Sequence, residues 1–159
     1  MPSTAERLQL FQQLYPKVNT VLVGSGTKED KLHALCQLLH SKVNWYNWVG
    51  FYLVDPANPQ LLVLGPYVGE STEHTRIPFS QGVCGRAASR KEIVLVNDVS
   101  QEPNYLACSR KVKSEIVVPI RKIDKLVGVL DIDSHTLEAF YKADQDFLKG
   151  ICDLLFIIF

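Results

Sequence analysis

The chain has 159 residues, 47% of them hydrophobic, with 17 basic and 17 acidic side chains. This length and composition predict one domain that is large enough to bury a core of its own. The balanced charge gives no broad attraction to nucleic acid or to a membrane surface, so we expect no partner of either class. The composition still allows the binding of small acidic or zwitterionic ligands through local charge.

The two ends of the chain show no targeting or membrane signal. The stretch MPSTAERLQLFQQLYPK lacks an apolar run of signal-peptide length and carries an early glutamate, Glu6. The C-terminal LLFIIF is too short to span a bilayer and is typical of the last turn of a packed or dimer-forming helix. We therefore expect a cytoplasmic protein, in which paired cysteines are more often catalytic or metal-binding than structural disulfides.

Two amphipathic stretches open the chain. Their apolar spacing predicts helices at 3–15 and 28–42, and Pro16 is expected to close the first. The hydrophobic period then changes, because NWYNWVGFYLV is aromatic and β-branched and favours a strand. The turn sequence PANPQ follows, and LLVLGPYVG is the expected partner strand.

The second half of the chain predicts shorter elements. Residues 82–90 suit a short helix entered through glycines, and residues 93–96 suit a short strand. After a long polar connection, strands at 116–121 and 126–134 form a hairpin around KIDK, and 142–158 is the closing helix. With no internal repeat, this order predicts an α+β domain whose mostly antiparallel central sheet is flanked by helices.

The four cysteines fall into two groups. Cys36 and Cys152 lie on apolar helix faces, which favours buried core thiols. Cys84 and Cys108 lie among small and polar residues in loop–helix regions. A zinc site is not expected, because the sequence has no CxxC spacing and its histidines are scattered. The pattern leaves two interpretations of this pair, a structural one and a redox one.

The segment after Cys108 is basic. Arg110, Lys111 and Lys113 would lower the pKa of a nearby thiol by stabilising its thiolate, which is the nucleophilic form. The alternative is that these cations form a solvated loop face. Charge alone does not separate the two.

Two acids in GVLDIDS also point to chemistry. Asp131 and Asp133 are two residues apart in a predicted strand, so both side chains face the same way into apolar surroundings. Close carboxylates oppose each other's ionisation, so one of them holds a proton near neutral pH. Glu115 opens the adjacent strand and would join them across the hairpin. The alternative is that Asp133 and Ser134 end the strand and begin a turn.

The stretch NWVGFYL places two aromatic side chains on one strand face. Trp48 and Tyr52 share parity, whereas Phe51 points to the opposite face. Such a stripe is most often part of a core. The other interpretation is the wall of a small-ligand pocket, in which Trp48 or Tyr52 offers a hydrogen bond.

Five stretches of the chain resemble the free methionine-(R)-sulfoxide reductases, which are small single-domain GAF-fold enzymes. The matching pieces, in family order and spacing, are NWVGFYL, LVLGPYVG, TRIPFSQGVCG, ACSRKVKSEIVVPI and LVGVLDIDS. They cover the chain from about residue 43 to residue 134, and the helical ends agree in pattern. The resemblance implies a single GAF domain over 1–159 and an oxidoreductase that needs no metal or organic cofactor.

The resemblance also implies roles for two cysteines. Cys108 matches the catalytic cysteine of the AC…SEIV motif, and Cys84 matches the resolving cysteine of GVCG. The implied reaction reduces free methionine-(R)-sulfoxide and leaves Cys108 as a sulfenic acid, which Cys84 converts to a redox-active disulfide. Thioredoxin is the implied reductant, and the implied enzyme is a homodimer that acts in oxidative stress.

The same likeness assigns the remaining site residues. A protonated carboxyl is expected to hydrogen-bond the sulfoxide oxygen, and aromatic side chains are expected to contact the substrate methyl group. The expected substrate-binding residues are Trp48, Tyr52, Glu115, Asp131 and Asp133. The carboxyls among them are also expected to take part in catalysis.

The chain departs from the family pattern near the expected nucleophile. His74 stands where many members have a further cysteine, and Ser109 follows Cys108 where the family usually has aspartate. EPNYLAC replaces the usual FPGHIAC. The alternative function is therefore a non-catalytic GAF module for small-molecule binding or signalling, and a weaker one is a paralogue that only dimerises.

Overall fold

A six-stranded antiparallel sheet with helices on both faces forms the computed structural model, which describes residues 1–106 and 109–159. The helices are α1 (Thr4–Val23), α2 (Lys28–Lys42), α3 (Gly82–Arg90) and α4 (Lys142–Leu154), with short 3-10 turns η1 (Val99–Gln101) and η2 (Leu155–Ile158). The strands are β1 (Trp48–Asp55), β2 (Asn58–Val68), β3 (Arg76–Pro78), β4 (Val94–Val96), β5 (Ser114–Lys122) and β6 (Lys125–Ser134).

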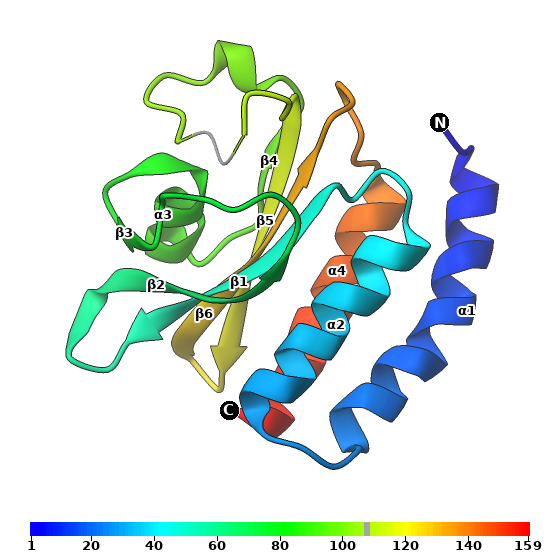
Figure 1. Ribbon diagram of the computed structural model, residues 1–159, viewed down its shortest axis with the longest axis horizontal. Helices are drawn as coiled ribbons and strands as arrows, with labels where there is room; N and C mark the ends of the chain where they lie inside the picture. Colours follow the sequence, from blue (N-terminus) through cyan, green and yellow to red (C-terminus); the bar gives the residue numbers. More distant parts are fainter. Residues whose placement is uncertain (107–108) are drawn as a thin grey trace.

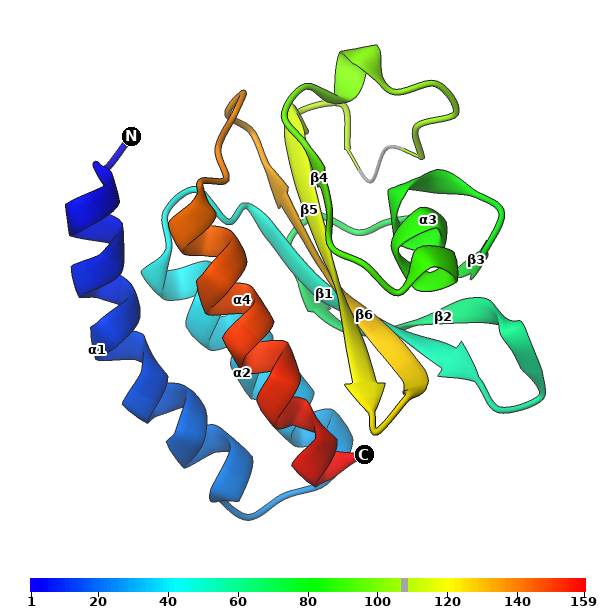
Figure 2. The ribbon, with the colours of Figure 1, turned by 180° about the vertical axis from the view of Figure 1, so that it is seen from behind.

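The strands lie in the order β3-β2-β1-β6-β5-β4. Helices α2 and α4 cover one face, with α1 packed on them from outside, whereas α3 and the long connections cover the other face (Figure 1, and from behind in Figure 2). The predicted α+β class with an antiparallel sheet is confirmed. None of the helices in the described ranges combines the length and the apolar character that a membrane crossing requires.

Alternating side chains of the central strands supply two separate cores. Phe51 of β1 packs in the cluster formed with α1, α2 and α4, whereas Trp48 and Tyr52 pack in the cluster that includes α3. This confirms the opposite parity expected for these aromatics. Cys36 and Cys152 lie in the first cluster, as their helix faces predict. Burial raises the pKa of Cys36 to about 12, so its thiol stays protonated and inert.

The pairing of three central strands sets the positions of the predicted acids. Asp133 lies opposite Trp48 of β1 on one side and opposite Glu115 of β5 on the other. Asp131 lies opposite Val117, one pleat further along the same face. The sheet register alone therefore brings the three carboxyls to one end of the sheet, on the face that α3 covers.

The expectation that Pro16 closes the first helix is wrong, because α1 continues to Val23. Val18 and Leu22 continue the apolar period of Leu14 beyond the proline, and all three are buried. A proline inside a helix removes one backbone hydrogen bond, and the burial of two more apolar residues offsets that loss. Helix α1 ends only at Gly24.

The other predicted elements differ from the structure mainly at their ends. The helices at 28–42 and 82–90 have the predicted bounds, and the hairpin strands extend beyond 116–121 and 126–134 by one to two residues. The closing segment is an α-helix only to Leu154, after which its last turn tightens to η2. Strand β3 is too short to show a period, which is why the sequence does not predict it.

A buried ion pair attaches α1 to the rest of the fold. Arg7 is fully buried, and its Nη1 lies 2.5 Å from Oδ2 of Asp144 and donates to the carbonyl of Ala139 at 2.7 Å. Asp144 also accepts hydrogen bonds from Trp45 Nε1 at 2.8 Å and from the Tyr46 hydroxyl at 2.9 Å. Each partner offsets the desolvation of the other, so removing either leaves a buried polar group without its partner.

We expect Arg7→Ala to lower the free energy of unfolding by about 3–5 kcal/mol, because it leaves the Asp144 carboxylate buried and unpaired. Urea denaturation followed by circular dichroism measures the change. The matched control is Lys149→Ala, which breaks the exposed pair with Asp153 on α4 and should cost less than about 0.5 kcal/mol. Equal losses in the two variants would contradict this account.

Candidate functional site

An enclosed cavity lies between α3 and the sheet, at the end where the acids gather. Its volume is about 10 Å³, which is room for roughly one water molecule. Strands β1, β3, β5 and β6, helix α3, and the connections between β2 and β3 and between η1 and β5 supply its walls. The lining residues are Tyr52, His74, Ile77, Gly82, Val83, Cys84, Leu106, Glu115 and Asp131.

Two glycines allow α3 to lie against the sheet. Gly82 starts the helix with φ of +64°, a conformation that side chains disfavour, and an added Cβ would lie 3.0 Å from Leu106. At Gly85 an added Cβ would lie 2.6 Å from the carbonyl oxygen of Pro78. The sequence GVCG thus lets the helix pack closely enough to place Cys84 inside the cavity.

Three carboxyls are buried together on this face of the sheet. Glu115, Asp131 and Asp133 are 5%, 1% and 0% exposed. The side chains of Glu115 and Asp131 share a hydrogen bond, and the Asp133 charge also acts on Glu115. The predicted cluster across the hairpin is therefore present, and β6 also ends at Ser134 with a turn after it, as the alternative expects.

Burial is the main cause of the raised pKa values in this cluster. It raises the pKa of Glu115 well above the usual range, and the charges of Asp131 and Asp133 raise it further. Burial also raises the pKa of Asp131 to about 7, against the lowering effect of hydrogen bonds from Cys84 and Glu115. At neutral pH we therefore assign a proton to Glu115, which donates it in the hydrogen bond to Asp131.

Cys84 completes the group. It is buried in the first turn of α3, and its thiol donates a hydrogen bond to Asp131. Its Sγ and one oxygen each from Glu115 and Asp131 lie within 4.8 Å of one another, which makes them a possible ligand set for a metal ion. A thiol next to a proton-holding carboxyl can also take part in reduction, because it offers electrons and a proton at one place.

The aromatic side chains hold the connection between β2 and β3 over the sheet. Trp48 donates from Nε1 to the carbonyl of Glu70 at 3.0 Å, and the Tyr52 hydroxyl donates to the carbonyl of His74 at 2.8 Å. Tyr52 lines the cavity, whereas Trp48 stacks on Tyr67 with ring centroids 5.3 Å apart. Both rings are therefore core, as the first interpretation expects, and Tyr52 also lines the cavity, whereas the role of either ring in binding a ligand stays a prediction.

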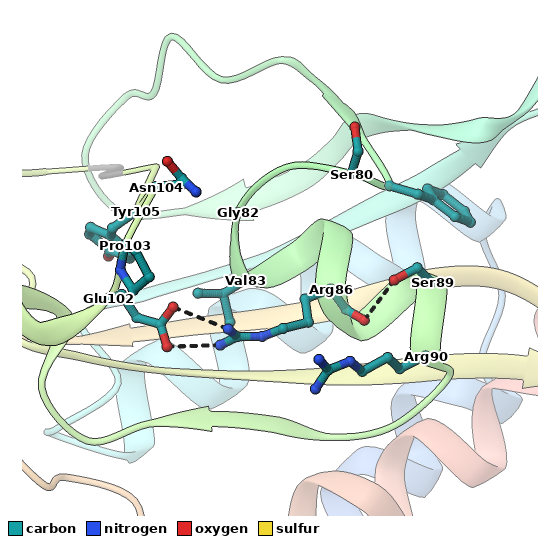
Figure 3. Close-up of a pocket in the computed structure, with 11 residues that line it drawn as sticks. Ser80, Gly82, Val83, Arg86, Ser89, Arg90, Glu102, Pro103, Asn104 and Tyr105 are labelled. Carbon is teal, nitrogen blue, oxygen red and sulfur yellow. Dashed lines mark hydrogen bonds and ion pairs between the residues drawn. The ribbon is translucent and has the colours of Figure 1, made fainter.

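The segment 102–106 covers the cavity from outside. Arg86 of α3 donates from both Nη atoms to the Glu102 carboxylate, at 2.9 and 3.2 Å (Figure 3). Further along, the Tyr105 hydroxyl hydrogen-bonds Glu115, and Leu106 lines the cavity. Between α3 and residues 102–105 lies an open pocket of about 350 Å³, which Arg90 also lines (Figure 3).

A second contact holds the other end of the same connection. Lys111 pairs with Glu70 at 2.5 Å, and the Ser109 side chain also hydrogen-bonds Glu70. Ser109, one of the sequence departures, thus has a defined partner in the β2–β3 connection. The basic residue Lys111 is an exposed member of an ion pair, which agrees with the interpretation of a solvated loop face for this side chain.

The structure brings together part of the predicted site. Cys84, Glu115 and Asp131 meet in the cavity, and Asp133 lies beside Glu115. Cys108 lies outside the described residues. Sequence reasoning missed the Arg86–Glu102 pair and the contact of Tyr105 with Glu115, because no period or motif marks residues that meet through a loop.

Comparisons with known proteins agree with this architecture. The family model described as GAF domain matches residues 27–159. The chain is 37% identical over 153 residues to GAF domain-containing protein A of Dictyostelium discoideum, covering 96% of this chain and 94% of that protein. It is 38% identical over 164 residues to free methionine-R-sulfoxide reductase of Saccharomyces cerevisiae, covering 96% and 87%.

A solved structure is also similar. The X-ray structure of free methionine-R-sulfoxide reductase from Neisseria meningitidis, in complex with its substrate, superposes with a TM-score of 0.89 at 36% sequence identity. The match covers 95% of this chain and 89% of the other.

The raised pKa values predict a stability that falls as the pH rises. Carboxyls in the unfolded chain ionise near pH 4, whereas folded Asp131 holds its proton to about pH 7 and Glu115 holds its proton well above the usual range. The folded state therefore binds more protons over this window, and its stabilisation is lost as pH rises through it. Asp131 alone should lower the free energy of unfolding by roughly 3 kcal/mol from pH 5 to pH 8, and Glu115 should add to this fall.

Urea denaturation at the two pH values measures this slope. Asp131→Asn should flatten it, since that side chain no longer exchanges a proton on unfolding. Asp124→Asn, at an exposed position, should leave the slope unchanged. A wild-type stability that stays level or rises between pH 5 and 8 would show that the buried acids are not held protonated.

The cover predicts that Arg86 controls access to Cys84. Arg86→Ala removes a half-buried bidentate ion pair, so we expect iodoacetamide to alkylate Cys84 about fivefold faster, as read by peptide mass spectrometry. Exchanging the partners, Arg86→Glu with Glu102→Arg, should recover most of the protection. The matched control is Lys142→Ala, which breaks an exposed pair on α4. An unchanged rate in Arg86→Ala would mean that this pair does not hold the cover.

Proposed function

The chain belongs to the family of GAF domain proteins that includes the free methionine-R-sulfoxide reductases, and from this premise we propose that it reduces free methionine-(R)-sulfoxide to methionine. The observation that carries the proposal is the buried meeting of Cys84, Glu115 and Asp131. Reducing a sulfoxide to a sulfide consumes two electrons and two protons. Thiols supply the electrons, and carboxyls with a raised pKa supply protons at neutral pH.

Glu115 is the proposed acid. Its proton hydrogen-bonds the sulfoxide oxygen in place of Asp131 and makes the sulfur more electrophilic. The thiolate of Cys108, assigned by the resemblance, attacks that sulfur. This attack forms a bond between the two sulfur atoms. The protonated oxygen then passes from the substrate sulfur to the Cys108 sulfur, the bond between the two sulfur atoms breaks, and methionine leaves while Cys108 is left as a sulfenic acid. The substrate sulfur gains the two electrons that the Cys108 sulfur loses. The carboxyl that gave up its proton then takes up another proton from water.

Cys84 is the proposed resolving thiol. Its sulfur attacks the sulfenic acid, so that a Cys84–Cys108 disulfide forms and water leaves. The two Cα atoms must come within about 7 Å for this bond. The dithiol of thioredoxin then reduces the disulfide by exchange and is itself oxidised. Thioredoxin, the homodimer and the cytoplasmic location are the parts of the proposal that rest on the resemblance and on the composition.

The cavity has to enlarge before a substrate binds. The space between α3 and the sheet is about 10 Å³, and the preference for a free amino acid over a peptide rests on the resemblance. Even free methionine sulfoxide is larger than this space, so binding requires the cover at 102–106 to move away. When it moves, the Tyr105 hydroxyl leaves Glu115, and the Glu115 proton turns from Asp131 to the sulfoxide oxygen. The remaining carboxylates offer partners for the substrate ammonium group.

The test is methionine release from separate free R and S methionine sulfoxide, with thioredoxin, its reductase and NADPH. We expect consumption of the R form alone, and loss of at least about a thousandfold in kcat for Cys108→Ser, because no other group replaces the nucleophile. Consumption of neither form by the wild-type chain would favour the alternative, a non-catalytic GAF module that binds a small molecule.

A second variant separates chemistry from recycling. Cys84→Ser should release about one equivalent of methionine per chain and then stall with thioredoxin, because the sulfenic acid has no partner. Cys36→Ser, in the opposite core, is the matched control and should keep multiple turnover. Sustained turnover in Cys84→Ser would assign the resolving role to another thiol.

A further inference from the structure

Three atoms that can bind a metal, one thiol sulfur and two carboxylate oxygens, converge in the small cavity from three different elements. Sγ of Cys84, on α3, and one oxygen each of Glu115, on β5, and Asp131, on β6, lie within 4.8 Å of one another. In a tetrahedral zinc site with bonds of about 2.0–2.3 Å, the ligand atoms stand about 3.3–3.6 Å apart. Side-chain movements that shift these three atoms by roughly 1 Å would therefore bring them close enough to bind one ion.

The space between them fits an ion. The cavity volume of about 10 Å³ matches roughly one water molecule or one metal ion, so an ion enters without the larger opening that an amino acid requires. The ligands are also buried, which removes competition from bulk water. A cluster on the surface would lack this advantage.

The polar atoms of the site point to a missing ligand. Asp131 Oδ1 is buried and has no hydrogen-bond partner among the described residues. The groups that act on Glu115 and Asp131 in the described ranges are carboxyls, the Tyr105 hydroxyl and the Cys84 thiol, none of which is a cation. A divalent cation would be coordinated by Asp131 Oδ1, and its positive charge would offset the buried negative charge.

The ligand types select the class of ion. Calcium and magnesium take oxygen ligands alone, whereas one thiolate with two carboxylates suits a borderline ion such as Zn²⁺. We infer that the reduced protein binds one Zn²⁺-class cation through Cys84, Glu115 and Asp131, with the fourth position left to water. The ion displaces the thiol proton and the proton held by the carboxyls.

Binding of the ion has a consequence for the site. It fixes the thiolate and the carboxylates on the metal and fills the cavity, so the bound protein has neither the acid nor the space for a sulfoxide. The cation should therefore inhibit competitively against substrate. The metal site stands on the geometry alone, and only the inhibition rests on the proposed function.

The experiment titrates Co²⁺ into the reduced, metal-free full chain without substrate. A thiolate ligand gives a thiolate-to-cobalt charge-transfer band in the near ultraviolet, and we expect this band to saturate at one equivalent and to vanish when Zn²⁺ is added. Cys84→Ser should abolish the band, and Glu115→Gln should weaken Co²⁺ binding by at least about tenfold. Cys36→Ser is the matched control and should leave the band intact.

A second measurement does not depend on variants that fold. Zn²⁺ should slow alkylation of Cys84 in the wild-type chain by at least about tenfold, read by peptide mass spectrometry, and a chelator should restore the rate. Absence of the cobalt band, its persistence in Cys84→Ser, or an unchanged alkylation rate would each overturn the site. These readouts need no turnover, so a protein without reductase activity can still pass or fail them.

Discussion

The burial of three carboxyls at one end of the sheet is the constraint on which the functional face depends. Glu115, Asp131 and Asp133 are brought together by strand register, and their surroundings do not allow all of them to ionise. The fold meets this constraint with shared protons, a thiol from α3 and a hydroxyl from the cover. Each of these responses is also a chemical capability, because a held proton and a buried thiol are what a reduction requires.

The opposite face of the same sheet solves a similar problem in another way. Asp144 is as buried as Asp131, but it has Arg7 as a cation and further hydrogen bonds from Trp45 and Tyr46. Those partners offset the charge of the Asp144 carboxylate and donate hydrogen bonds to its oxygens. The role of Asp144 is therefore to attach α1. The cluster around Asp131 has no cation among its described partners and keeps its capacity to bind a proton, an ammonium group or a metal. The difference in partners separates the structural face from the functional one.

Strand alternation made much of this predictable from the sequence. The shared side of Asp131 and Asp133, the opposite sides of Trp48 and Phe51, and the short helix that carries Cys84 all follow from local period and from glycine positions. The continuation of α1 through Pro16 did not follow, because the burial that offsets the proline depends on helices distant in sequence. The pair of Arg86 with Glu102 and the contact of Tyr105 with Glu115 were equally hidden, since loop geometry sets them.

These loop contacts also change the meaning of the departures from the reductase pattern. Ser109 and Lys111 both bind Glu70, and Tyr105 reaches the acid cluster itself, so the altered residues form specific contacts of the cover. The acids and Cys84 lie on sheet and helix, where rigid elements fix their geometry. Among the departures, Ser109 and Tyr105 therefore belong to the connection that covers the cavity, and His74 lies in the cavity wall, while the carboxyls are positioned by the sheet. Changes in the cover can therefore alter how the pocket opens and how fast it opens. The chemistry that the buried groups support stays the same.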